Sequence, residues 1–331
     1  MNHDPRTTNA WPMNRLPLAL LPALAAAFTA AVSSGCDTYE PAGVERQYVV
    51  EAYLQAGGAF PPVRLSRTAP VGGAYAFSAQ AVSGAAVRIR RTNGDGRSQV
   101  IPYVEDPDSA GLYRPRGEPQ NAAPTVEPLG RYRLTATGLP AGDGIAADTI
   151  TAATVVPDTF RITETSGDTL TWREDDLTAS VTRSQYPGRN ARFVVTTAAL
   201  NPTRENLTPF AEQALRRADS AAVDLDNLSV TESPVINEGN YEVGARGRIT
   251  IDVPWLVANF YGPNVIELRA LGQNYYDFLR SQQVQQGGST FSPGTIPNVI
   301  ERIDGGTGLF GSYAVVRYEL VVEREEEGVP S

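Results

Sequence analysis

Apolar and polar residues alternate over short stretches throughout the first half of the chain. Val87 and Ile89 alternate with Arg88 and Arg90, so a strand there would bury one face and leave the arginines in water. Further runs rich in β-branched and aromatic residues cover 47–54, 63–67, 99–104, 131–137 and 149–155. Gly, Pro, Asn or Asp bound each run, and the Asn-Gly-Asp-Gly within 92–96 is the strongest hairpin signal. Short strands without intervening helices predict an antiparallel β-sandwich.

The second half of the chain continues the strand pattern but adds two helical segments. Its predicted strands are 160–165, 169–172, 192–197, 248–253, 265–271 and 313–322. Thr208, followed directly by Pro, is typical of a helix N-cap, and Asn274 would cap a second helix that stops at Gly287. The segments 224–240 and 286–297 have no periodicity, so we expect long loops there.

These patterns predict an all-β protein, with an N-terminal Ig-like antiparallel sandwich followed by a second β-rich domain with two short helices. Once the first 35 residues are removed, the 331-residue chain is long enough for two domains of about 150 residues each. The predicted organisation is a signal peptide at 1–35, a tether at 36–46, the Ig-like domain at 47–157, the second domain at 158–325 and a tail at 326–331.

The N-terminus carries an apolar run, 16–32, that ends just before a lone cysteine. Pro17 and Pro22 interrupt the run, which is shorter than the roughly 20 residues that a spanning helix requires. The small residues 33–35 then precede Cys36, and the whole stretch resembles a bacterial lipoprotein signal. We expect cleavage before Cys36 and acylation of Cys36, which would hold the protein on a membrane without crossing it. The alternative is an ordinary signal peptide cut elsewhere, with Cys36 passive.

Composition excludes much chemistry. All 28 basic residues are Arg, and His3 and Cys36 are the only His and Cys. Beyond residue 35 there is therefore no imidazole or lysine amine for nucleophilic or Schiff-base catalysis, and there is no second thiol for a disulfide. We expect neither an enzyme nor a cofactor. The net charge of −9 opposes nucleic-acid binding, and the short basic run around Arg88 and Arg90 is interpreted as the solvated face of a strand.

A G-x-G-x-x-G pattern runs from Gly306 to Gly311. It leads into the apolar run 313–322 and not into a helix, so the dinucleotide-binding interpretation lacks its required context. We predict a tight backbone turn there instead, with Leu309 and Phe310 packing inward.

Carboxylates are the main remaining acid–base groups. Two of them at a suitable separation could hydrolyse a glycoside. The densest acidic clusters, 105–108 and 174–176, are interpreted as solvated turns, and a calcium ion bound at either remains an alternative.

Trp255, Phe260 and Tyr261 are the ligand-binding candidates, because they lie between two predicted strands and are flanked by Pro and Gly. Exposed rings at these positions could stack on sugars or grip a hydrophobic partner. The alternative is that the three rings pack in the core, as is expected of Trp172.

Several loose motifs occur together in a characteristic order. They are Cys36 and the segments 47–52 (QYVVEA), 62–67 (PVRLSR), 82–87 (VSGAAV), 111–113 (GLY), 132–134 (YRL) and 305–311 (GGTGLFG). In this order they resemble a family of uncharacterised Bacteroidota lipoproteins that carries a domain of unknown function and is often encoded beside TonB-dependent outer-membrane transporters. The resemblance implies an envelope lipoprotein, on the outer membrane, with a sandwich-type N-terminal domain.

Three functions follow as hypotheses. The favoured one is a lipid-anchored accessory protein that binds a ligand of unknown identity or docks on a TonB-dependent transporter. The second is a structural or adhesive surface lipoprotein, and the third is a carboxylate-dependent glycoside hydrolase. Its expected partners are the membrane, through acylated Cys36, and the transporter; nucleic acid is not among them.

Overall fold

The computed structural model describes residues 46–70, 74–92, 98–117, 124–140, 145, 148–217, 225–286, 300 and 302–325. Cys36, with the predicted signal peptide and most of the tether, lies outside these residues, as do the tail and the predicted loop beyond residue 286. Within the described part of the chain, no helix combines the length and apolar character needed to cross a membrane.

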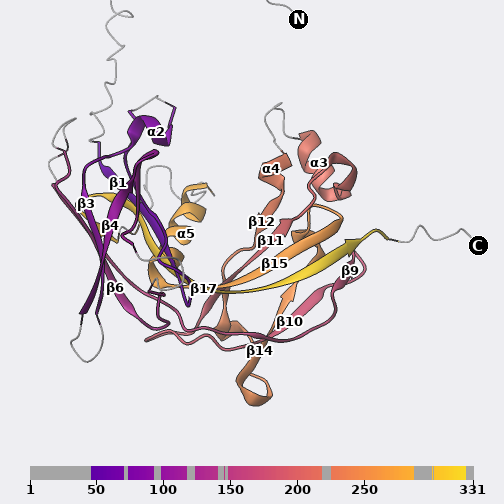
Figure 1. Cartoon of the computed structure of the whole chain (residues 1–331). Helices are drawn as coiled ribbons and strands as arrows, with labels where there is room; N and C mark the ends of the chain where they lie inside the picture. The colour runs from indigo at the N-terminus through magenta and orange to yellow at the C-terminus, as the bar shows by residue number, and fades with distance from the viewer. Residues whose placement is uncertain are drawn as a thin grey trace, which may run out of the picture. The chain divides into compact units, whose positions relative to one another are not determined.

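The first half of the chain forms a set of antiparallel strands around one core (Figure 1). The strands are β1 (Tyr48–Gln55), β2 (Val63–Arg67), β3 (Ala86–Thr92), β4 (Ser98–Asp106), β5 (Ser109–Pro115), β6 (Arg131–Thr137) and β7 (Thr149–Val155), with a short helix α2 (Phe77–Gln80). Their order in the sheet is β1-β2-β5-β4-β3-β6-β7. Inward side chains of β1 and of β3 and β6 belong to one buried cluster, as in a sandwich.

Alternation in this half gives the predicted burial. Val87 and Ile89 are 3% and 0% exposed, whereas Arg88 and Arg90 are exposed to solvent. The predicted hairpin turn falls mostly on residues outside the described part of the chain, but the two strands that it joins, β3 and β4, pair antiparallel.

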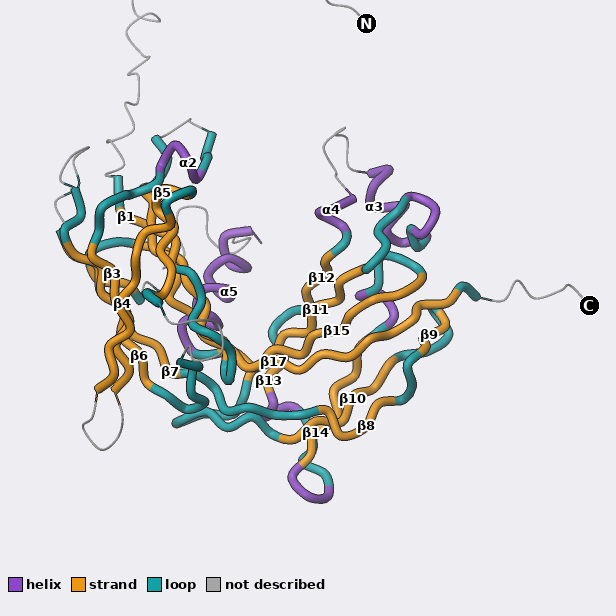
Figure 2. The backbone as a smooth tube through the Cα atoms, viewed as in Figure 1, coloured by secondary structure: helices purple, strands orange, loops and turns teal. Residues whose placement is uncertain are grey.

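The second half contributes a small sheet of its own, further strands of the 14-stranded large sheet that includes β1 to β7, and the remaining helices. Its strands are β8 (Ile162–Thr165), β9 (Thr169–Thr171), β10 (Leu177–Thr182), β11 (Arg192–Ala199), β12 (Val230–Glu232), β13 (Ile236–Asn237), β14 (Arg248–Val253), β15 (Gly262–Leu271), β16 (Ile303–Asp304) and β17 (Thr307–Glu323). The small sheet β14-β10-β8, seen together in Figure 2, shares one core with β11 and β15 of the large sheet. The all-β prediction is confirmed.

Both predicted helices are present, as α3 (Pro209–Arg217) and α5 (Gln273–Gln286). A further short helix α4 (Leu225–Leu228) and the 3-10 turns η1 (Arg204–Asn206), η2 (Glu238–Asn240), η3 (Ala245–Gly247) and η4 (Trp255–Val257) lie in connections. The predicted long loop at 224–240 is wrong, because β12 and β13 pair with β11. Strands of three and two residues are too short to show a period of two.

β17 connects the two halves of the fold. It pairs antiparallel with β15 and parallel with β1, so the large sheet is mixed and not purely antiparallel. The glycine pattern predicted as a turn instead lies mostly inside this strand, after a turn at Gly305. A Cβ on Gly308 would stand 2.2 Å from the Val50 carbonyl oxygen, so this glycine permits close approach to β1. Leu309 and Phe310 pack inward, as predicted.

The buried residues form two clusters that largely follow the order of the chain. One contains side chains from Tyr48 to Val156 together with Ile303 and Phe310, and the other runs from Phe160 to Val322. The domain limits at 157 and 158 stay a prediction.

Candidate functional site

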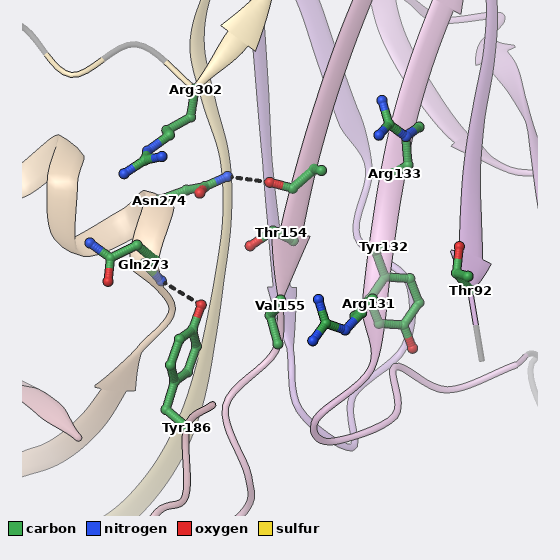
Figure 3. Close-up of a pocket in the computed structure, with 11 residues that line it drawn as sticks. Thr92, Arg131, Tyr132, Arg133, Thr154, Val155, Tyr186, Gln273, Asn274 and Arg302 are labelled. Atoms are coloured by element: carbon green, nitrogen blue, oxygen red, sulfur yellow. Dashed lines mark hydrogen bonds between the residues drawn. The ribbon is translucent and has the colours of Figure 1, made fainter. Parts of the chain in front are cut away.

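A groove of about 410 Å³ lies where β6 and β7 approach the start of α5 (Figure 3). Its lining residues are Thr92, Arg131, Tyr132, Arg133, Ala153, Thr154, Val155, Tyr186, Gln273, Asn274 and Arg302. In Figure 3 the residues of β6 stand on one side, and Gln273, Asn274 and Arg302 stand on the other. The groove therefore combines residues that are far apart in the sequence.

Arg131 and Arg133 supply the positive charge of the β6 side. They alternate with Tyr132 and Leu134, which are 2% and 0% exposed, so both arginines project to the solvent face. Burial raises the pKa of the Tyr132 hydroxyl, which accepts a hydrogen bond from the Glu127 N–H at 2.8 Å. Among the described residues, neither arginine has a hydrogen-bond or ion-pair partner, so both guanidinium groups are available to a ligand.

Arg302 lines the opposite side of the groove and is held by an ion pair. Its Nε and Nη2 donate to Asp277 Oδ2 at 3.0 and 2.7 Å, and Asp277 is only 2% exposed. The other carboxylate oxygen of Asp277 accepts from Gln273 Nε2 at 2.7 Å. This buried carboxylate fixes the guanidinium and offsets its charge, so Arg302 brings a positioned side chain to the groove but little net positive charge.

Arg189 fixes the position of the first residue of α5, Gln273. Arg189 stacks over the Tyr186 ring with its Cζ 3.9 Å from the centroid, and donates to Gln273 Oε1 at 2.9 Å. The Tyr186 hydroxyl in turn accepts the Gln273 N–H at 3.1 Å. Burial lowers the pKa of Arg189, with Tyr186 opposing that effect.

The base of the groove is a strand edge whose polar groups are already occupied. Asn274 Nδ2 donates to the Ala153 carbonyl at 2.7 Å and to the Phe310 carbonyl at 2.9 Å. Ser312 Oγ donates to the Val155 carbonyl at 2.7 Å. The prediction of Asn274 as a helix cap is therefore wrong, because its amide joins β7 to β17 from inside α5.

This arrangement is suited to binding an oxyanion. Guanidinium groups recognise carboxylate and phosphate through paired N–H donors, and no carboxylate is among the lining residues. The lining also contains no histidine, cysteine or serine, so it holds no conventional nucleophile–base pair.

The predicted ligand-binding residues lie elsewhere in the fold. Trp255 and Tyr261 both contact Trp172 edge-on, with ring centroids 5.0 and 6.0 Å from it. Phe260 is fully buried, Tyr261 is 8% exposed, and Trp172 is buried as predicted. Arg324 covers the Tyr261 ring at 4.2 Å. This geometry is that of a packed cluster, and its role in ligand binding stays a prediction.

Carboxylates of both acidic clusters are engaged in local hydrogen bonds and ion pairs. Asp106 accepts from Arg114 Nε at 2.5 Å and from the Asp108 N–H at 3.0 Å, and these contacts lower its pKa. Asp175 and Asp176 accept backbone N–H groups of Thr171 and Trp255. Within the described ranges, no group of three or more His, Cys, Asp or Glu is placed to hold a metal ion.

The fold and the groove together define a mostly β protein with an arginine-lined groove. A family model described as a domain of unknown function (DUF4249) matches residues 37–319, and the chain belongs to this family. Comparison with curated proteins gave no match.

One similar solved structure is that of a tetra-tandem repeat in the extending region of a large adhesion protein. It is 11% identical, covers 84% of this chain and 50% of its own, and has a TM-score of 0.21. The present chain thus spans about half the length of that structure.

Proposed function

We propose that this protein is a lipid-anchored accessory protein of the cell envelope that binds a ligand in the groove without transforming it. The observation that carries the proposal is the groove itself. Arg131 and Arg133 line one side of it without an ion pair to any described residue, and Arg302 lines the other side, paired with the buried Asp277. Such an arrangement supports binding of a negatively charged group and supplies no proton acceptor for catalysis.

The anchor and the partner complete the proposal. Cys36 follows an apolar run and small residues, which supports acylation and attachment to the outer membrane. The family resemblance supports a bacterium of the Bacteroidota as source and a TonB-dependent transporter as docking partner.

Two measurements on cells test this function. Radiolabelled palmitate should be incorporated into the wild-type protein and not into Cys36→Ala, since acylation requires the thiol. Pull-down in mild detergent through a C-terminal tag should recover a β-barrel transporter with the wild type. Arg161→Ala, a change at an exposed surface residue, is the control and should recover the same transporter. Recovery of the protein alone, or equal labelling of the Cys36 variant, would contradict the proposal.

A further inference from the structure

The β6 arginines continue into a larger basic array on the outer face of the first sheet. β3 and β6 pair so that Arg90 lies opposite Arg133, and Thr92 lies opposite Arg131. Arg88 precedes Arg90 by two residues, so it lies on the same face. All four arginines are exposed, because the intervening positions of both strands point into the core.

The array has no internal counter-charge. Neighbouring strands are about 5 Å apart and alternate residues about 7 Å apart, so the four arginines start from one small area of the sheet. None of them has a hydrogen-bond or ion-pair partner among the described residues. Their other cross-strand neighbours on this face are neutral, with Arg88 opposite Thr135 and Pro102. In a chain with net charge −9, this is a local concentration of positive potential that attracts anions.

The shape of the surface indicates an elongated ligand. A second hollow of about 430 Å³, lined by Arg91, Thr92, Glu127, Pro128, Leu129, Gly130 and Arg131, adjoins the groove. The two share Thr92 and Arg131, so both hollows border the end of β3 and the start of β6; Glu127, which also lines the second, is paired with Arg91. An extended chain with repeated charges would meet several arginines along this surface.

We propose that the four-arginine face and the groove bind an anionic glycan, a polysaccharide chain that carries carboxylate or phosphate groups. The inference rests on the proposed function and names its ligand class. An acidic peptide is a poorer fit, because the carbonyls of Ala153 and Val155 at the β7 edge are already occupied and cannot accept an added strand. The exposed hydroxyl of Thr92 lies beside the arginines, where it could bond sugar hydroxyls.

Isothermal titration calorimetry with the purified full-length chain tests whether it binds an anionic glycan. The probes are oligogalacturonate for carboxylate and a phosphorylated mannan for phosphate, with neutral dextrin as the negative control. Wild type should bind at least one anionic glycan, with an affinity that falls as salt rises. Arg131→Ala/Arg133→Ala should weaken binding at least about tenfold, because two charge-assisted contacts are lost. Arg131→Lys/Arg133→Lys should keep only part of the wild-type affinity, since lysine retains the charge but lacks the paired N–H donors of arginine.

The matched control is Arg161→Ala/Arg204→Ala, which removes two exposed arginines that line neither hollow. It should change the affinity less than twofold. All three double variants should unfold at or above the wild-type temperature, which separates lost binding from misfolding. The inference is overturned if no anionic glycan binds, if the control weakens binding equally, or if poly-glutamate or single-stranded DNA binds as tightly. Palmitate labelling is unaffected by these results, so failure of the ligand class and failure of the anchor are distinguishable.

Discussion

Replacing Ser312 by Ala should destabilise the protein at the junction that holds the two sides of the groove. Ser312 is fully buried, and its hydroxyl donates to the Val155 carbonyl at 2.7 Å. That leaves the Thr154 hydroxyl, 3.0 Å away and 5% exposed, to donate to Ser312 Oγ. The pair thus forms a short relay from β17 to the β7 edge.

The size of the effect follows from the groups left without partners. In Ser312→Ala, the Thr154 hydroxyl loses its acceptor and the Val155 carbonyl loses a donor. A buried polar group without a partner costs about 1–3 kcal/mol, so the expected loss is about 2–4 kcal/mol. In Thr154→Val the serine keeps its acceptor, and the loss should be about 1 kcal/mol. With both changes, no hydroxyl is left unpaired, so the losses should fall short of additivity by about 1–2 kcal/mol.

Urea unfolding of the wild type, the two single variants and the double variant gives the coupling free energy directly. Thr182→Val, which removes a partly exposed hydroxyl on β10, is the control and should show no coupling with Ser312→Ala. Strict additivity of Ser312→Ala and Thr154→Val would refute the relay. A wild-type stability for Ser312→Ala would refute the assigned cost.

Three further outcomes can be measured on the same protein. Gly308→Ala should cost more than about 3 kcal/mol or prevent folding, because Gly308 has φ +110° and its Cβ would meet the Val50 carbonyl oxygen at 2.2 Å; unfolding at the wild-type urea concentration would contradict this. Trp255→Ala should cost about 1–3 kcal/mol of unfolding free energy, because it removes a half-buried ring that packs against Trp172. Urea unfolding followed by circular dichroism would measure this loss. Burial alone would raise the pKa of Glu267. Hydrogen bonds from one arginine of β15 and one of β17 lower it by more than burial raises it, so the pKa lies below the ordinary 4.5. The stability from this group should be fully present above about pH 4.5 and lost as the pH falls through the lower folded value, and Glu267→Gln should flatten that loss in acid-unfolding curves.

The strands that could be predicted are those whose pattern is local. In β6, and in β3 as far as Ile89, every second residue is apolar, so period and burial agree. The helix at Pro209 was equally visible, because its capping threonine and proline are adjacent in the sequence. What the sequence could not show was the parallel pairing of β1 with β17, since those strands are separated by the whole intervening chain.

The groove was missed for the same reason. Arg131 and Arg133 stand out only as the wet positions of a strand, and Arg302 has no signal of its own. Their significance depends on α5 approaching β7, an approach fixed by Asn274 bonding two distant carbonyls. Conversely, Trp255 and Tyr261 were visible as aromatic residues, but sequence could not tell that Trp172 would cover them.

The four-arginine face needs an explanation from outside the fold. Like charges directly opposite each other on a sheet cost about 0.2–1 kcal/mol, and Arg90 and Arg133 are such a pair. Acidic partners are not scarce in a chain with 37 acidic residues. Glu267 alone pairs with two arginines, one on β15 and one on β17. Yet the face places Thr135 and Ala153 beside these arginines, where a carboxylate would neutralise them. Among the described residues this face leaves its charge unpaired, and the anionic glycan that we propose would supply the missing counter-charge.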